Sequence, residues 1–67
     1  MSERILTTAE IGQMLGVHQG TVARWVDKGK LKAMVTLGGH RRIKQRDLIA
    51  FFRENHMPLP DELASPQ

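Results

Sequence analysis

The chain has 67 residues, the size of one small domain with a single hydrophobic core. A domain of this size buries only about 60% of the surface that its unfolded chain exposes, so no interior is left for a substrate cavity. We therefore expect a protein that is not an enzyme. Cysteine is absent, which excludes disulfides, thiolate catalysis and thiolate zinc sites. With no apolar run of membrane-spanning length and no signal-peptide pattern, we expect a cytoplasmic protein without a membrane partner.

The net charge of +3 is unevenly distributed along the chain. Residues 18–46 hold eight lysines and arginines against Asp27 alone, which gives this segment a net charge of +7. Residues 54–67 instead carry a net charge of −3. A basic segment of this density indicates a polyanionic partner, with nucleic acid favoured over anionic lipid.

The first predicted element is a short helix that begins at about Thr8. Thr7 and Glu10 have the spacing of a capping box, in which each residue's side chain accepts a hydrogen bond from the other's backbone. Gly16 supplies the left-handed residue that ends the helix. A helix of barely two turns is unstable alone in water, so it must pack against a neighbour.

A second helix is predicted over residues 19–28, with Val22 and Val26 facing inward. Two short helices joined by a brief turn that contains glycine form the helix-turn-helix pattern, in which the second helix lies in the major groove of DNA. An ordinary helical hairpin with a solvated outer face is the alternative. The outer face of this second helix carries small, polar and basic residues, which are Gly20, Thr21, Arg24 and Lys28.

A two-stranded ribbon is predicted next, with strands over residues 32–36 and 40–43. The Gly38-Gly39 pair permits the positive φ angles of a tight turn between them. Arg41 and Arg42 are adjacent and must point to opposite faces, so at most one can pack on the body while the other projects freely. Beside a helix-turn-helix, such a ribbon is a wing. The alternative is a solvated hairpin whose charges only prevent edge pairing.

The last predicted helix covers residues 45–55 and is structural. Leu48, Phe51 and Phe52 share one face and are expected to cover the helix pair. Trp25, the single tryptophan, is predicted to fill the small core rather than to stack on a base.

Pro58 and Pro60 exclude a continuation of this helix. We therefore expect one domain over residues 1–56, followed by an acidic tail or linker over residues 57–67. The predicted fold is mainly α with a small β-hairpin, a winged helix-turn-helix that consists of a helix-turn-helix, a two-stranded wing and a packing helix.

The sequence lacks the combinations of residues that perform catalysis or bind metals. The three histidines, His18, His40 and His56, lack metal-ligand spacing. Paired carboxylates in a cleft, a Ser or Thr placed beside a histidine and a phosphate-binding glycine loop are also absent. We therefore expect no catalytic residue, no metal, no cofactor and no small-molecule ligand in this segment.

Five runs of sequence together resemble the MerR-type winged helix-turn-helix, in its compact excisionase-like branch. The resemblance covers about residues 5–55, and the most specific run is Gly-Gly-His-Arg-Arg after a threonine. It implies a bacterial DNA-binding module whose second helix enters the major groove and whose wing approaches phosphates or the minor groove. The runs are 6–11, 15–17, 21–25, 29–31 and 36–43.

The resemblance also implies a set of DNA-contacting residues on the second helix and the wing. His18 stands where the family usually has Ser, Thr or Asp, which is a weaker start for the helix. Gly20 weakens the first turn further but lets the backbone approach DNA closely. The candidate DNA-binding residues are Gln19, Gly20, Thr21, Arg24, Lys28, Lys30, His40, Arg41 and Arg42.

The leading functional hypothesis is sequence-specific binding of double-stranded DNA in transcription regulation. The alternatives are an excisionase-like architectural factor that bends DNA for recombination, and a protein-interaction module that keeps the fold. We expect an isolated domain that is monomeric and, in the cell, associated with the nucleoid. It is either a free-standing regulator or the DNA-binding domain of a larger protein with a sensory or receiver domain.

Overall fold

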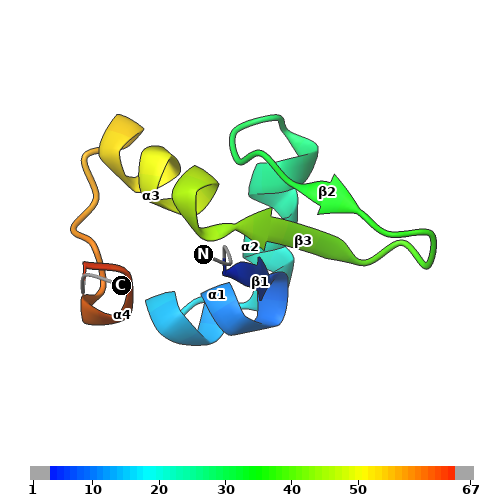
Figure 1. Cartoon of the computed structure of the whole chain (residues 1–67), viewed down its shortest axis with the longest axis horizontal. Coiled ribbons are helices and arrows are strands. Elements are labelled where there is room, and N and C mark those ends of the chain that lie inside the picture. Colours follow the sequence, from blue (N-terminus) through cyan, green and yellow to red (C-terminus); the bar gives the residue numbers. More distant parts are fainter. Residues whose placement is uncertain (1–3, 65–67) are drawn as a thin grey trace.

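The computed structural model describes residues 4–64 of the chain, and its fold is mainly α with a small antiparallel sheet, as predicted. Helices α1, α2 and α3 form the body, and the hairpin of β2 and β3 projects from it as a wing (Figure 1). The elements are β1 (Ile5–Thr7), α1 (Thr8–Leu15), α2 (Gln19–Asp27), β2 (Met34–Val35), β3 (Arg41–Lys44), α3 (Gln45–Glu54) and α4 (Asp61–Ala64).

The predicted capping box starts α1. The Thr7 side chain accepts a hydrogen bond from the Glu10 backbone N–H at 3.1 Å, and the Glu10 carboxylate accepts one from the Thr7 N–H at 3.0 Å. The helix ends at Gly16, which has a φ of 73°. Gly12 is buried where α1 meets the turn before α2. A Cβ at this position would lie only 2.7 Å from the carbonyl oxygen of Val17, so the close approach of the turn requires glycine.

Strand β1 was not predicted from the sequence. The sheet has the order β1-β3-β2, with both pairs antiparallel. Leu6 of β1 lies opposite Ile43 of β3, and both side chains are fully buried. Strand β1 therefore anchors the wing to the body immediately before α1 begins.

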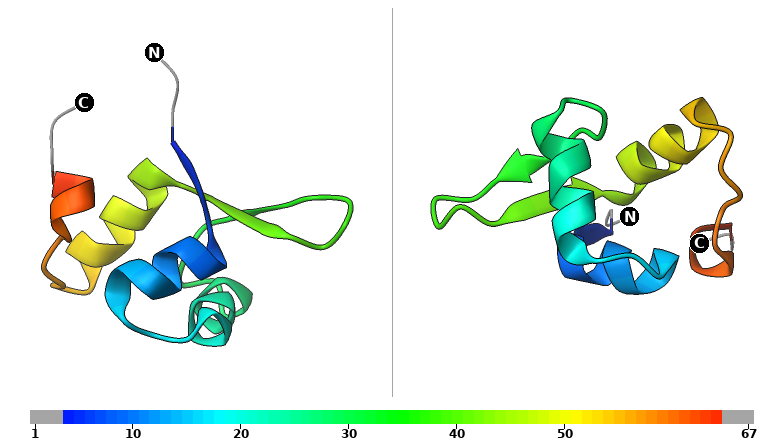
Figure 2. Two further views of the ribbon diagram at one scale, coloured as in Figure 1. Left: turned by 90° about the horizontal axis from the view of Figure 1, so that it is seen from below. Right: turned by 180° about the vertical axis from the view of Figure 1, so that it is seen from behind.

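Strand β2 is shorter than predicted, and β3 has the predicted length but starts one residue later. Strand β2 spans two residues and β3 spans four, with Met34 opposite Arg42 and Val35 opposite Arg41. In both views of Figure 2 the wing is a thin arm that extends from one side of the body. A ribbon this short depends on the pairing of β3 with β1 for its position.

The core lies between the helices and the sheet. Trp25 is half-buried rather than central, and it packs against the core with its ring centre 5.1 Å from that of Phe51. The predicted core face of α3 is buried as expected. The buried hydrophobic residues are Leu6, Ile11, Val22, Leu31, Ile43, Leu48, Phe51, Phe52 and Leu63.

The segment expected to be a tail or linker folds back onto the domain. Met57 and Leu59 pack against the core, and Leu63 of α4 is only 4% exposed within it. Helix α4 lies at the opposite end of the molecule from the wing (Figure 1). Residues 57–64 thus contribute to the same core as the three longer helices. Residues 65–67 of the expected tail lie outside the described residues.

Candidate nucleic-acid interface

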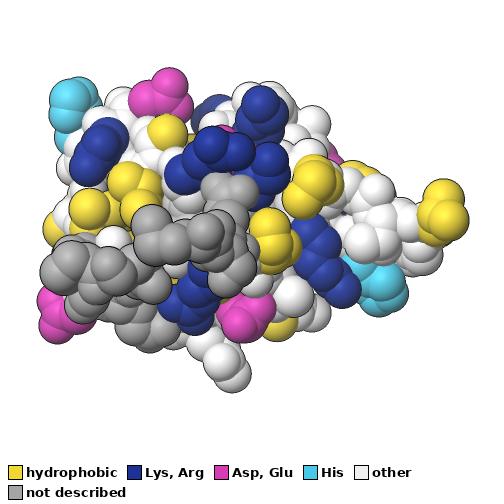
Figure 3. Space-filling view, viewed as in Figure 1, with side chains coloured by type: hydrophobic (Ala, Val, Ile, Leu, Met, Phe, Trp, Pro, Cys, Tyr) yellow, Lys and Arg dark blue, Asp and Glu magenta, His cyan; other side chains and the backbone are white. Residues whose placement is uncertain are grey.

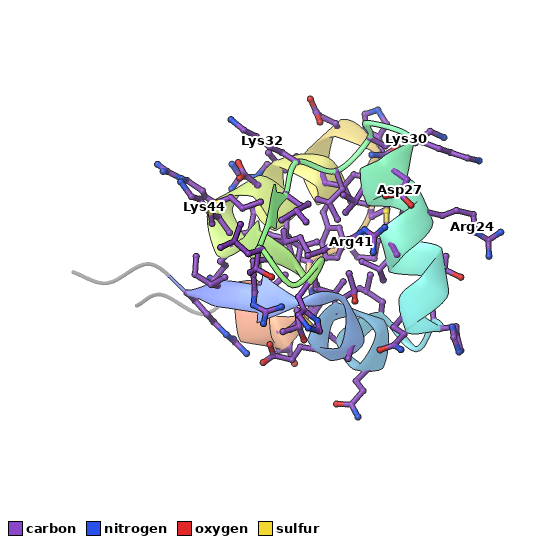
Figure 4. The ribbon with its side chains drawn as sticks, turned by 90° about the vertical axis from the view of Figure 1, so that its right-hand side faces the viewer. Arg24, Asp27, Lys30, Lys32, Arg41 and Lys44 are labelled. Atoms are coloured by element: carbon purple, nitrogen blue, oxygen red, sulfur yellow. The ribbon has the colours of Figure 1, made fainter. Side chains whose placement is uncertain are left out.

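Helix α2 presents its predicted outward face to solvent. Gln19, Arg24 and Lys28 are exposed, whereas Gly20 and Thr21 are half-buried. The Arg24 side chain points away from the body (Figure 4). The middle of this helix therefore offers an unobstructed guanidinium to a ligand that approaches from outside.

His18 caps the start of α2 with its side chain, which sequence reasoning did not predict. Its Nδ1 accepts a hydrogen bond from the backbone N–H of Gly20 at 3.0 Å. A Cβ at Gly20 would lie 3.1 Å from that nitrogen, so the glycine leaves room for the imidazole. In the neutral ring the proton is then on Nε2, because Nδ1 acts as the acceptor. The start of α2 is thus better supported than its sequence indicates.

The wing is joined to α2 by an ion pair between Arg41 and Asp27. The guanidinium donates from Nε to Oδ1 at 3.2 Å and from Nη2 to Oδ1 and Oδ2 at 2.9 and 3.1 Å. Figure 4 shows the two side chains facing each other between β3 and α2. Sequence reasoning missed this role for Asp27, although its position as the single carboxylate among residues 18–46 was a signal.

Arg42 lies on the other face of β3, as the alternation of a strand requires. It is half-buried, and its Nη1 donates to the carbonyl oxygen of Arg41 at 3.2 Å. At most one of the two arginines was expected to pack on the body, and Arg41 does so through its ion pair with Asp27. The expectation that the other projects freely is wrong, because the guanidinium of Arg42 turns back onto its own strand.

The remaining basic residues do not converge on one surface. Lys30 is exposed just beyond the end of α2, and His40 is exposed on the wing. Lys32 and Lys44 point away from the side that carries Arg24 (Figure 4). Lysine and arginine side chains also gather on the face shown in Figure 3, between α3 and the loop that follows α2. Fewer cations can therefore contact one ligand than the number of basic residues in segment 18–46 suggests.

The described residues of this interface include no buried ionisable group. Among the side chains that the structure describes, those of residues 4–61 and 63, no polar or charged one is buried, and no group of three or more His, Asp or Glu is close enough to hold a metal ion. Within the same part of the chain, no helix has the length and apolar character needed to cross a membrane.

The two short helices, the tight turn between them and the adjoining wing define the class of helix-turn-helix DNA-binding domains. The chain belongs to the helix-turn-helix domain family, which it matches over residues 5–56. The matched region runs from β1 through α3 and therefore includes both helices of the motif and the wing. No curated protein sequence matches the chain. Because the chain belongs to this family, DNA is the partner whose fit to the surface of α2 has to be considered.

Proposed function

We propose that the protein binds specific sequences of double-stranded DNA and regulates transcription in a bacterium. It resembles the MerR-type winged helix-turn-helix in its compact excisionase-like branch, and the run from Thr36 to Arg42 is also similar to the small developmental regulator BldC. We place it in the cytoplasm, associated with the nucleoid, as a monomer that is either free-standing or joined to a sensory or receiver domain.

In this proposal α2 occupies the major groove and Arg24 reads a base. A guanidinium can donate to N7 and O6 of one guanine, and Arg24 is exposed in the middle of the helix. Lys28, just beyond the end of α2, is better placed for a phosphate, as is Lys30 in the loop that follows. Gln19, Gly20 and Thr21, in the first turn of the helix, lie where residues at the start of a recognition helix meet base edges.

The wing supplies contacts outside the major groove. His40 is exposed there, and Arg42 can turn its guanidinium from the Arg41 carbonyl toward a phosphate. Arg41 is paired with Asp27 at the end of α2, so in the wild type its guanidinium is not available to a phosphate. The observation that carries the proposal is this union of an exposed basic helix face and a wing fixed next to it.

Fluorescence anisotropy with a random-sequence duplex across a salt series tests the proposal. If Lys28, Lys30 and Arg42 contact phosphates, the logarithm of the binding constant falls with the logarithm of the salt concentration with a slope of about −2.7. Arg24→Ala is expected to weaken binding. Lys44→Ala removes the same charge on the opposite side of the molecule and is the matched control, expected to have little effect (Figure 4). No binding by the wild type at low salt would overturn the proposal and favour a protein-interaction module.

A second candidate function is that of an architectural factor that bends DNA for recombination. One observation favours it, the fully exposed side chain of Leu37 at the end of the wing. Side chains of this kind kink DNA in several architectural proteins. Footprint length separates this candidate from a regulator that reads a short site, because a protein of either kind can bend its DNA.

A further inference from the structure

The tip of the wing carries an apolar side chain with no contact to the rest of the domain. Leu37 is 110% exposed relative to a reference residue, which is more than any other large hydrophobic residue in residues 4–64. Figure 3 shows a hydrophobic group at the far end of the wing, next to a histidine. Removing a leucine side chain from water stabilises a complex by about 1.5–3 kcal/mol, so a ligand that covers this tip gains affinity.

Three hydrogen bonds hold the turn that carries Leu37. The backbone of Thr36 pairs with that of His40, with the Thr36 N–H donating to the His40 carbonyl at 2.9 Å. Inside this pair the Gly39 N–H donates to the Thr36 carbonyl at 2.9 Å, and the His40 N–H donates to the Thr36 hydroxyl at 3.2 Å. Gly39 has a φ of 81°, the left-handed residue that closes a three-residue hairpin loop.

The tip is also narrow. The two residues after Leu37 are glycines, so no second side chain of the loop stands beside it. Leu37 lies two residues of extended chain, about 7 Å, beyond Val35, which pairs with the Arg41 that contacts α2. The domain therefore projects one leucine on a thin ribbon past the side of its recognition helix.

The charge around the tip identifies the kind of ligand that fits it. The wing, residues 33–43, carries Arg41 and Arg42 and has no Asp or Glu. One leucine cannot supply the roughly 1,000 Å² that a stable protein interface buries. The minor groove of DNA is about 6 Å wide and polyanionic, and single leucine, isoleucine or methionine side chains enter it as wedges between base steps.

We propose that Leu37 is an apolar wedge that enters the minor groove next to the major groove occupied by α2, partly unstacks one base step and kinks the duplex. The inference rests on the proposed DNA-binding function and adds a residue that acts through shape rather than charge. Flexible pyrimidine–purine steps such as TpA are the preferred targets, because they unstack most easily.

The test uses a short A·T-rich duplex with 2-aminopurine beside its TpA steps and a dye pair at its ends. The wild type is expected to raise 2-aminopurine fluorescence, which reports unstacking, and to bend the duplex by about 20–90°. Leu37→Ala is expected to abolish both signals. The affinity of this variant falls by less than about tenfold, because the energy of unstacking offsets most of the gain from burying the leucine.

Two further variants serve as controls. Leu37→Met retains a side chain that can act as a wedge, so it is expected to retain the bend and the fluorescence rise. Val35→Thr removes a different exposed apolar side chain from the wing, 64% exposed, and is expected to behave as wild type. Because Leu37 contacts no other part of the domain, circular dichroism is expected to show the same fold for both Leu37 variants.

Wild type and Leu37→Ala that bind with equal bending and equal fluorescence would overturn the wedge while leaving DNA binding intact. No binding of wild type to any duplex would instead overturn the proposed function and the wedge together. Sedimentation that shows a wild-type dimer dissociated by Leu37→Ala would reassign the tip to self-association. Binding of phosphatidylserine vesicles that is lost in Leu37→Ala, without a wild-type DNA kink, would reassign it to membranes.

Discussion

The Asp27 carboxylate weakens DNA binding in two ways, because it repels phosphates and holds the Arg41 guanidinium in an ion pair. The substitution Asp27→Asn removes both effects. The carboxylate lies at the end of α2 and is 58% exposed, so it also faces an approaching phosphate backbone. At about 10 Å in water one carboxylate repels one phosphate by about 0.4 kcal/mol. Two or three nearby phosphates make this about 1 kcal/mol, a factor of about five in affinity at low salt.

We therefore expect Asp27→Asn to bind a random duplex about fivefold more tightly than wild type at low salt. Release of the Arg41 guanidinium adds one phosphate contact and steepens the salt slope by about 0.9. The fold is expected to persist, because a pair as exposed as this one contributes at most about 1 kcal/mol, or about 8 °C in melting temperature for a small domain. Strand β3 keeps its position by pairing with β1 and β2 on its two sides.

Anisotropy titrations of Asp27→Asn, Arg41→Ala and wild type measure these effects. Asp61→Asn removes the same charge at the end of the molecule far from the wing and is the control (Figure 1). Arg41→Ala is expected to weaken binding, because it leaves the Asp27 carboxylate uncompensated. A fall in affinity for Asp27→Asn with an unchanged salt slope would refute the reasoning and show that the ion pair holds the wing in its binding position.

Three substitutions test the packing of the domain. Gly12→Ala places a Cβ 2.7 Å from the carbonyl oxygen of Val17 and is expected to lower the free energy of unfolding by about 1–3 kcal/mol in thermal denaturation. Trp25→Ala is expected to lower it by about 3 kcal/mol in urea denaturation, because the ring stacks on Phe51 but is only half-buried. Unchanged stability with lost DNA affinity would instead make Trp25 a contact residue. Leu63→Ala is expected to lower it by about 2 kcal/mol, and no change in melting temperature would show that α4 does not stabilise the domain.

Local signals in the sequence were sufficient for the two helices of the motif. The capping box of Thr7 and Glu10 and the left-handed Gly16 act within one or two turns, so the residues that specify the helix ends are close in sequence. The Gly38-Gly39 pair specified the wing turn for the same reason. The outward face of α2 followed from helical periodicity alone, and Arg24 lies on it as predicted.

Contacts between distant residues were not predictable in the same way. Strand β1 exists because Leu6 pairs with Ile43, and three residues are too few to show an alternating pattern. Helix α4 was missed because Pro58 and Pro60 indicated an end to regular structure. The burial of Leu63 depends on a surface that only the folded core provides.

The candidate DNA-binding residues stay a prediction from the sequence, and the sequence did not predict how their side chains are arranged. At most one of Arg41 and Arg42 was expected to pack on the body, with the other projecting freely, whereas Arg41 is paired with Asp27 and Arg42 donates to the backbone of β3. Lys44 belongs to the basic segment yet lies on the other side of the molecule from Arg24 (Figure 4). Counting charge along the chain cannot show these directions, because they depend on the path of the sheet.

Binding-site selection with wild type, Arg24→Ala and Lys28→Ala tests the central claim, that α2 reads bases in the major groove. Arg24→Ala is expected to lose about 1–3 kcal/mol at the selected site and to relax the preference for one guanine. Lys28→Ala is expected to weaken all sequences evenly and to reduce the salt slope by about 1. Selected sequences for Arg24→Ala that match those of wild type, with only the affinity reduced, would contradict the account and assign Arg24 to a phosphate.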